Sequence, residues 1–172
     1  METRQMSTRL IKHGTLVPDT WVLVKSPDEL ESLEKLTGQD LIVPLPYWLT
    51  ERQSIESRKG QTAVWLNSNE IPESIAGYLD RLPLVALNFP EFKDGRPYSS
   101  ARELRQRWGY QGEIRAVGDV LRDQLFFMKR CGFDAFLLRE DQNPDAALTA
   151  FHDFQDAYQP GITQPLPLFR RR

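Results

Sequence analysis

Cysteine and histidine are scarce in this sequence of 172 residues, which contains one cysteine, Cys131, and two histidines, His13 and His152. A single thiol excludes an intramolecular disulfide, a CxxC redox pair and a four-cysteine iron–sulfur cluster. With so few thiols and imidazoles, we expect neither a cysteine-rich zinc site nor a multi-histidine metal site.

Long hydrophobic runs and the common cofactor motifs are also missing. The sequence has no run of about 18 apolar residues, so no transmembrane helix is predicted. Residues 1–14 lack the apolar core of a signal peptide, and we therefore expect a soluble cytoplasmic protein. There is no G-x-G-x-x-G after a strand, no P-loop, no H-E-x-x-H and no G-x-S-x-G. A dinucleotide-dependent oxidoreductase therefore gains no support from the residues.

The composition that remains is that of one globular domain. Hydrophobic residues make up 40% and charged residues 27%, and a chain of this length buries roughly 70% of its unfolded surface. The net charge is −2, but residues 1–92 carry −4 whereas residues 93–139 carry +4. The basic segment would attract a small anion or an acidic partner, or it forms solvated helix faces. It is too weakly basic to indicate nucleic-acid binding.

Short apolar runs alternate along the chain with amphipathic segments, which indicates an α/β fold with a mostly parallel sheet. We expect a single domain over residues 1–158 with about six βα units, either open and doubly wound or resembling part of a (β/α) barrel. A closed eight-stranded barrel would need about 250 residues. Residues 159–172 are proline-rich, and we expect them to form an extended tail. The predicted strands cover residues 20–25, 41–49, 62–66, 84–89, 113–117 and 135–138.

Local signals set several helix and strand predictions. Because Pro44 and Pro46 lack a backbone N–H, we expect the strand at 41–49 to be an edge strand or an irregular one. Ser100 and Glu103 have the spacing of a capping box, which predicts a helix over 100–108. Asp119 is expected to cap the helix that Gly132 ends.

Ligands of parallel sheets bind beyond the carboxyl ends of the strands, which selects the loops at 88–99, 118–123 and 139–141. A helix beginning after the first loop would offer free N–H groups to a sulfate, sulfite, phosphate or carboxylate. The alternative is that this loop makes only a turn and a helix cap. Asp119 and Arg122 are the candidate catalytic residues of the second loop, although Asp119 as a cap needs no substrate. The predicted anion-binding residues are Asp94, Arg96, Tyr98, Ser99 and Ser100.

Two segments, FPEFKDGRPYS at 89–99 and RAVGDVLRDQL at 115–125, resemble the bacterial family called domain of unknown function 934. Proteins of this family are described as probable oxidoreductases and are commonly encoded beside sulfite reductase. Pro97 departs from the small residue expected there, and it removes one N–H donor from the loop.

The resemblance implies an accessory protein of assimilatory sulfate and sulfite reduction, which would dock on sulfite reductase or another enzyme of the pathway. The alternative is an oxidoreductase of the same pathway, with a loosely bound flavin or a small oxyanion substrate. A third hypothesis is an inert βα scaffold. The cofactor and the oligomeric state stay open, and no nucleic acid or membrane is implied as a partner.

Overall fold

Eight strands and the helices between them make up the part of the chain that the computed structural model describes, residues 9–30 and 37–153. No described helix is long and apolar enough to cross a membrane. In chain order the elements are β1 (Leu10–Lys12), β2 (Thr15–Val17), β3 (Trp21–Leu23), α1 (Pro27–Leu30), β4 (Asp40–Pro44), α2 (Leu45–Thr50), α3 (Arg52–Glu56), β5 (Thr62–Leu66), the 3-10 helix η2 (Pro72–Arg81), β6 (Leu84–Phe89), α4 (Arg96–Gln106), β7 (Glu113–Gly118), the 3-10 turn η3 (Arg122–Gln124), α5 (Leu125–Cys131), β8 (Ala135–Leu137) and α6 (Pro144–Asp153).

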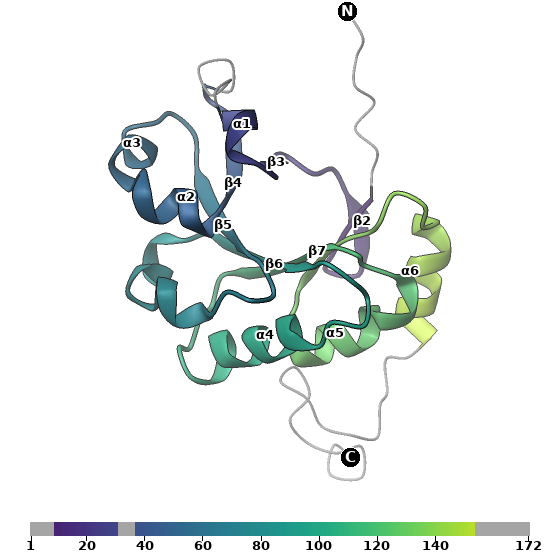
Figure 1. Cartoon of the computed structure of the whole chain (residues 1–172). Helices are drawn as coiled ribbons and strands as arrows, with labels where there is room; N and C mark the ends of the chain where they lie inside the picture. Colours follow the sequence, from purple (N-terminus) through teal and green to yellow (C-terminus); the bar gives the residue numbers. More distant parts are fainter. Residues whose placement is uncertain (1–8, 31–36, 154–172) are drawn as a thin grey trace, which may run out of the picture.

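The strands form one sheet in the order β2-β1-β8-β7-β6-β5-β4-β3 (Figure 1). Strands β3 to β8 are parallel and follow one another in chain order, whereas β1 pairs antiparallel with both β2 and β8. The α/β class and the mostly parallel sheet are therefore confirmed. The antiparallel hairpin of β1 and β2 was not predicted, because each strand has three residues and shows too little alternation.

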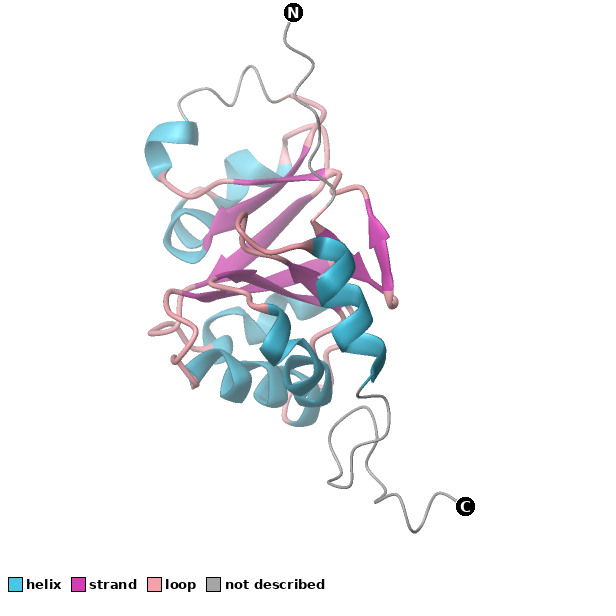
Figure 2. Cartoon of the chain, turned by 90° about the vertical axis from the view of Figure 1, so that its right-hand side faces the viewer, coloured by secondary structure: helices cyan, strands magenta, loops and turns pink. Residues whose placement is uncertain are grey.

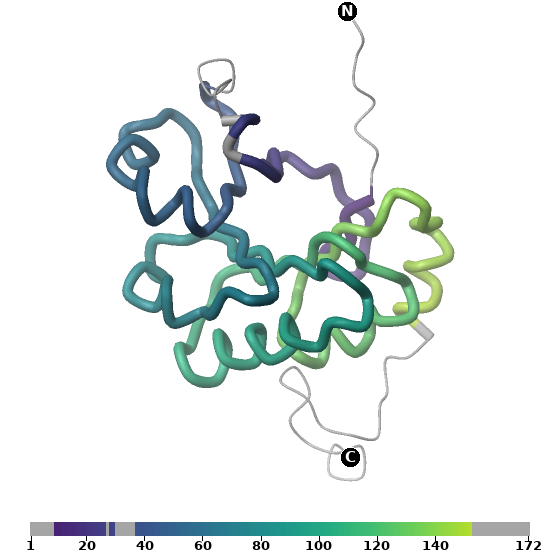
Figure 3. Tube along the Cα trace, in the orientation of Figure 1, coloured from purple at the N-terminus to yellow at the C-terminus, as the bar shows by residue number. Residues whose placement is uncertain are grey.

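The two edge strands, β2 and β3, are separated by only three residues of chain, 18–20. A flat sheet of eight strands would place its edges about 34 Å apart, whereas the link between Val17 and Trp21 spans at most about 14 Å. The sheet must therefore curl, and it forms a half-barrel (Figures 1 and 2). The backbone trace steps around this curve from β3 to β8 (Figure 3).

The helices cover the outer, convex face of the sheet. The larger buried cluster joins outward-facing strand residues such as Val64 and Leu87 to helix residues such as Ile75, Leu104 and Met128. A second, smaller cluster contains residues of the strands alone and lies on the inner face. A doubly wound sheet has helices on both faces and a reversal of strand order. Of the two predicted architectures, the structure therefore agrees with the barrel-like one.

The strand predicted at 41–49 is shorter and more central than expected. Strand β4 ends at Pro44 and lies between β3 and β5, so the prediction of an edge or irregular strand was wrong. Pro44 is the last residue of its strand, where a missing N–H donor disturbs the ladder least. Pro46 belongs to the first turn of α2, where the N–H would be unpaired in any case.

Helix α4 begins at Arg96, four residues before the predicted start, so the capping box at Ser100 was wrong. Asp94 accepts the Arg96 backbone N–H at 3.0 Å, and Pro97 lies in the first turn. This earlier start is set by an aspartate and a proline rather than by the serine. The end of α5 is as predicted, because Gly132 follows it with a φ of 115°. The predicted tail at 159–172 lies outside the described residues.

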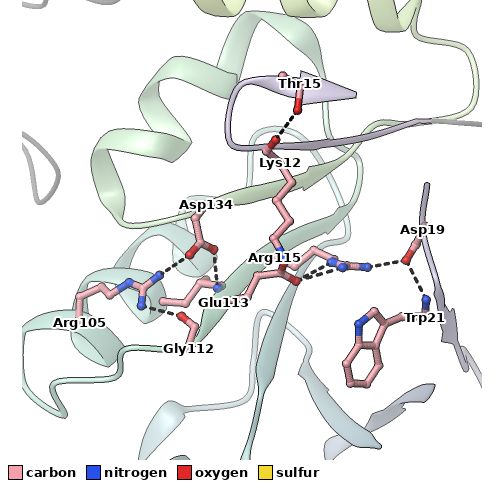
Figure 4. Close-up of polar contacts among 10 residues, drawn as sticks. Lys12, Thr15, Asp19, Trp21, Arg105, Gly112, Glu113, Arg115 and Asp134 are labelled. Atoms are coloured by element: carbon pink, nitrogen blue, oxygen red, sulfur yellow. Dashed lines mark hydrogen bonds and ion pairs between the residues drawn. The ribbon is translucent and has the colours of Figure 1, made fainter. Parts of the chain in front are cut away.

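Charged side chains lie inside the curve of the sheet, at its open seam (Figure 4). Arg115, on β7, is 2% exposed, and its guanidinium lies 2.9 Å from Asp19 and 3.0 Å from Glu113. Glu113 also lies 2.7 Å from the Lys12 ammonium on β1. Asp19 belongs to the three-residue link and also accepts the Trp21 N–H at 3.0 Å. Arg115 therefore holds the link between the two sheet edges toward the barrel interior.

A second polar cluster holds α4 against the amino-terminal ends of β7 and β8 (Figure 4). The Arg105 guanidinium donates to the carbonyls of Tyr110, Gly112 and Gly132 and lies 3.2 Å from Asp134. Burial raises the pKa of the Asp134 carboxyl, which also accepts the Ile114 N–H at 2.7 Å. This cluster lies at the opposite end of the strands from the site described below.

Arg115→Met is expected to lower the free energy of unfolding by about 3–5 kcal/mol, because it leaves Asp19 without its buried partner. Arg107→Met is the control, since Arg107 is 57% exposed on the surface and pairs with Glu103; its cost should stay below about 1 kcal/mol. Urea unfolding of both variants makes the comparison. Equal, small losses would show that the link does not depend on Arg115.

Candidate functional site

A cavity of about 830 Å³ opens at the carboxyl ends of the parallel strands, inside the curve of the sheet. Strands β3, β5, β6, β7 and β8 or the loops after them contribute to its wall, together with the residue before β1 and the link after β2. In barrels of this kind, ligands bind at the carboxyl-terminal face. The polar residues of the wall are Arg9, Asp19, Lys25, Asn88, Asp119, Arg139 and Glu140.

Small side chains lie on the inner face of the sheet below the cavity. Ala63, Ala86 and Ala135 point inward from β5, β6 and β8 and are fully buried, and they are not part of the cavity wall. Trp65 and Leu137 lie closer to the carboxyl ends of their strands, are partly exposed and belong to the apolar inner wall of the cavity. The Trp65 indole N–H donates to the Val24 carbonyl at 2.8 Å, which fixes the orientation of its ring.

Asp119 and Arg139 connect three loops at the mouth. The Asp119 carboxylate accepts the Phe92 N–H at 2.7 Å and pairs with the Arg139 guanidinium. The other edge of that guanidinium makes two bonds of 2.6 Å to Asp141. These bonds to Asp141 and Asp119 raise the pKa of Arg139, and Arg139 in turn lowers the pKa of Asp141. Asp119 is thus held as a carboxylate acceptor and not as the helix cap that was predicted.

Arg9 and Lys25 bring two further cations to the same cavity from the other side of the seam. One Arg9 nitrogen donates to the Leu138 carbonyl at 2.6 Å, while the other lies 4.0 Å from the exposed Glu140. Lys25 follows β3 and is exposed, and no carboxylate of the described residues lies within 4.0 Å of its ammonium. The mouth therefore receives cations from three separate parts of the chain.

Gly118 allows β6 and β7 to approach each other at the edge of the cavity. Its φ is 90°, and a Cβ atom there would lie 2.5 Å from the Phe89 carbonyl oxygen and would overlap the Asn88 side-chain oxygen. Asn88 donates in turn to the Asn67 side chain at 3.1 Å, across the ends of β5 and β6. Position 118 therefore requires glycine, both because its φ is positive and because there is no room for a Cβ atom.

Of the predicted site residues, the structure brings only Asp119 into the cavity wall. Arg122 points elsewhere, with its guanidinium 3.5 Å from Asp123 and its backbone N–H bonded to Gln142. Arg96 and Asp94 form a closed pair at 2.7 Å, and the side-chain hydrogen bond from Arg96 holds the pKa of Asp94 well below its usual range.

The other three predicted anion-binding residues belong to helix α4. The Tyr98 ring packs against Phe89 and Phe127, and burial raises its pKa to about 12. Ser99 and Ser100 lie within the helix rather than at its start. The first residue of helix α4 is therefore an arginine paired with Asp94, and the start of the helix is not an open anion-binding site.

Three polar residues of the cavity wall were not predicted, namely Arg9, Asp19 and Lys25, whereas Asn88 begins the predicted loop at 88–99. Arg139 lies in a loop that the sequence rule selected, at the carboxyl end of β8. Arg9 and Asp19 reach the cavity only because the β1–β2 hairpin completes the curve. In the described residues, no group of three or more His, Cys, Asp or Glu side chains is arranged to hold a metal ion.

Gly118→Ala is expected to lower the free energy of unfolding by roughly 2–4 kcal/mol, because it adds both backbone strain and a clash with Phe89. Gly95→Ala is the matched control: its φ is −85° and a Cβ there meets no atom within 4 Å. It should change stability by no more than about 0.5 kcal/mol. Thermal and urea unfolding measure both, and a tolerated Gly118→Ala would contradict the close approach of β6 and β7.

Comparison with known proteins places the chain in a family. The sequence matches no curated protein. A family model described as "Bacterial protein of unknown function (DUF934)" matches residues 63–169, a span that begins in β5 and includes Asn88, Gly118, Asp119 and Arg139. This span covers more than half of the sequence, and the chain therefore belongs to the DUF934 family of bacterial proteins.

Proposed function

We propose that the protein is an accessory component of assimilatory sulfite reduction, which binds a small oxyanion at the mouth of the half-barrel. The observation that carries the binding proposal is the convergence of Arg9, Lys25 and Arg139 on one cavity from three parts of the chain. Guanidinium and ammonium groups are the usual partners of sulfite, sulfate, phosphate and carboxylate. The resemblance to the family is what connects the proposal to sulfite reduction.

The three cations would play different parts. Arg139 is already bonded along both edges by Asp119 and Asp141, so it shapes the wall and would contact an anion only at its exposed side. Arg9 offers the nitrogen that lies 4.0 Å from Glu140, and Lys25 offers an exposed ammonium. An oxyanion would therefore bind between Arg9 and Lys25, on the side of the mouth where the sheet is open.

The proposed partner is sulfite reductase or a neighbouring enzyme of the pathway. Residues 93–139 carry a net charge of +4 within a chain whose net charge is −2. A charge distribution of this kind favours association with an acidic surface. Binding of that type weakens as salt shortens the screening length to about 8 Å at physiological ionic strength.

An oxidoreductase of the same pathway is the second candidate, and the size of the cavity favours it. A volume of about 830 Å³ lies within the usual range of cofactor and substrate pockets. Asp119, fixed by the Phe92 N–H and Arg139, would act as a general base in such an enzyme. A flavin, bound through loops rather than a glycine fingerprint, would supply the redox chemistry.

Sulfite or sulfate is expected to raise the melting temperature, whereas chloride at equal ionic strength is not. At a hundredfold its dissociation constant, a ligand stabilises the fold by about 2.7 kcal/mol, or roughly 5–10 °C here. Lys25→Glu should remove most of this shift. Lys59→Glu, an equal change of charge on an exposed residue before β5, should keep it. A shift that survives Lys25→Glu would mean that the anion binds elsewhere.

Purification of the tagged protein from cells grown on sulfate separates the two candidate functions. The accessory function predicts that sulfite reductase is recovered in stoichiometric amount, that its recovery falls with salt, and that the tagged protein is colourless. A tagged protein that is recovered alone and absorbs as a flavin would replace this function with the oxidoreductase. Recovery alone without colour would contradict the docking proposal and leave only the anion site.

A further inference from the structure

The cavity is far larger than an inorganic oxyanion, and its inner wall is apolar. Sulfite has four heavy atoms, whereas the cavity encloses about 830 Å³. Leu23, Trp65, Val117 and Leu137 line it from β3, β5, β7 and β8, and all four belong to or pack against the inner apolar cluster. Three of them, Leu23, Trp65 and Leu137, stay partly exposed.

The cations and the apolar surface lie in different parts of this cavity; of the carboxylates in its wall, Asp19 is paired with Arg115 and Asp119 with Arg139. The apolar side chains project from the strands themselves, on the inner face of the sheet. Arg9, Lys25 and Arg139 follow or precede strands and stand at the mouth. A ligand that contacts both the cations and the apolar wall carries its charge at one end and an apolar body at the other.

The apolar wall of the cavity includes a fixed aromatic surface. The Trp65 ring is fixed by its bond to the Val24 carbonyl and presents a rigid aromatic surface. Ligand pockets typically combine such apolar walls with a few placed polar groups.

From this arrangement we infer that the ligand is an organic oxyanion, a sulfonate, carboxylate or phosphate attached to an aromatic or aliphatic body of about six to ten carbons. Its oxyanion binds Arg9 and Lys25, and its body lies against Trp65, Leu23 and Leu137. The inference rests on the proposed oxyanion site and specifies the chemical class that the site takes. Inorganic sulfite then occupies the head-group position alone and binds weakly.

Four probes of graded structure test this inference in calorimetric titrations of the whole protein. Benzenesulfonate has both parts of the ligand, methanesulfonate and sulfite have the head group, and benzyl alcohol has the body. Benzenesulfonate is expected to bind at least tenfold more tightly than each of the other three. Its binding should also quench tryptophan fluorescence, because its ring contacts Trp65.

Variants then locate the two ends of the ligand. Leu137→Trp fills the inner region and should weaken benzenesulfonate binding at least tenfold while leaving the weaker binding of methanesulfonate unchanged. Leu49→Trp, on the outer helix α2 where Leu49 is 44% exposed, should change neither. Leu23→Trp fills the same region from β3 and replaces Leu137→Trp if that variant fails to fold. Lys25→Glu should weaken both sulfonates.

Each alternative outcome has a distinct meaning. Equal affinities for methanesulfonate and benzenesulfonate would overturn the inference and leave the oxyanion site standing. Equal affinities for benzyl alcohol and benzenesulfonate would overturn the role of the head group. Benzenesulfonate binding that survives both tryptophan variants would place the ligand outside the cavity. Failure of every oxyanion to bind would overturn the proposed function together with the inference.

Discussion

The three-residue link between the two sheet edges sets the shape on which the rest of the structure depends. Arg115 projects from the middle of the sheet into its concave side, and Asp19 lies in this link. The Arg115 guanidinium lies 2.9 Å from the Asp19 carboxylate and holds the link toward the concave side. A buried arginine is costly unless it is paired, so this pair also fixes which strand the link faces.

Curvature has a direct consequence for the site. Side chains at the carboxyl ends of β3 and β8 are far apart in a flat sheet, with four strands between them. In the half-barrel, the residues that follow these two strands, Lys25 and Arg139, line one cavity. The antiparallel hairpin adds Arg9 to the same wall, because β1 starts where β8 ends.

The division between the two faces of the sheet also separates the main hydrophobic core from the proposed binding site. The outer face carries the larger cluster, with helices packed on it, and most of the buried hydrophobic residues belong there. The inner cluster is small and its apolar residues near the mouth are partly exposed. Changes on the inner face near the mouth would therefore alter the proposed ligand binding while the outer core maintains the fold.

Sequence patterns predicted the central strands well, because each of these elements carries its own signal. The bounds of β5 and β6 match the predicted 62–66 and 84–89, since both are continuous apolar runs between turn residues. The errors fall where local signals compete. Pro44 and Pro46 led to the prediction of an edge or irregular strand, although Pro44 ends a central strand and Pro46 lies at a helix start. Ser100 was predicted to cap helix α4, but Asp94 and Pro97 mark its start.

The amino-acid sequence alone predicts the α/β class, the mostly parallel sheet, the DUF934 family and the loops at the carboxyl ends that contain Asp119 and Arg139. Tertiary structure alone decided that the sheet curls, that Arg96 is paired and that Arg9, Asp19 and Lys25 join the cavity. The physical reason is that helix and strand signals act over a few neighbouring residues. Curvature, by contrast, depends on the three-residue link between the two edge strands, which become edges only when all eight strands pair. Asp19 of this link binds Arg115, which lies 96 residues away in the chain.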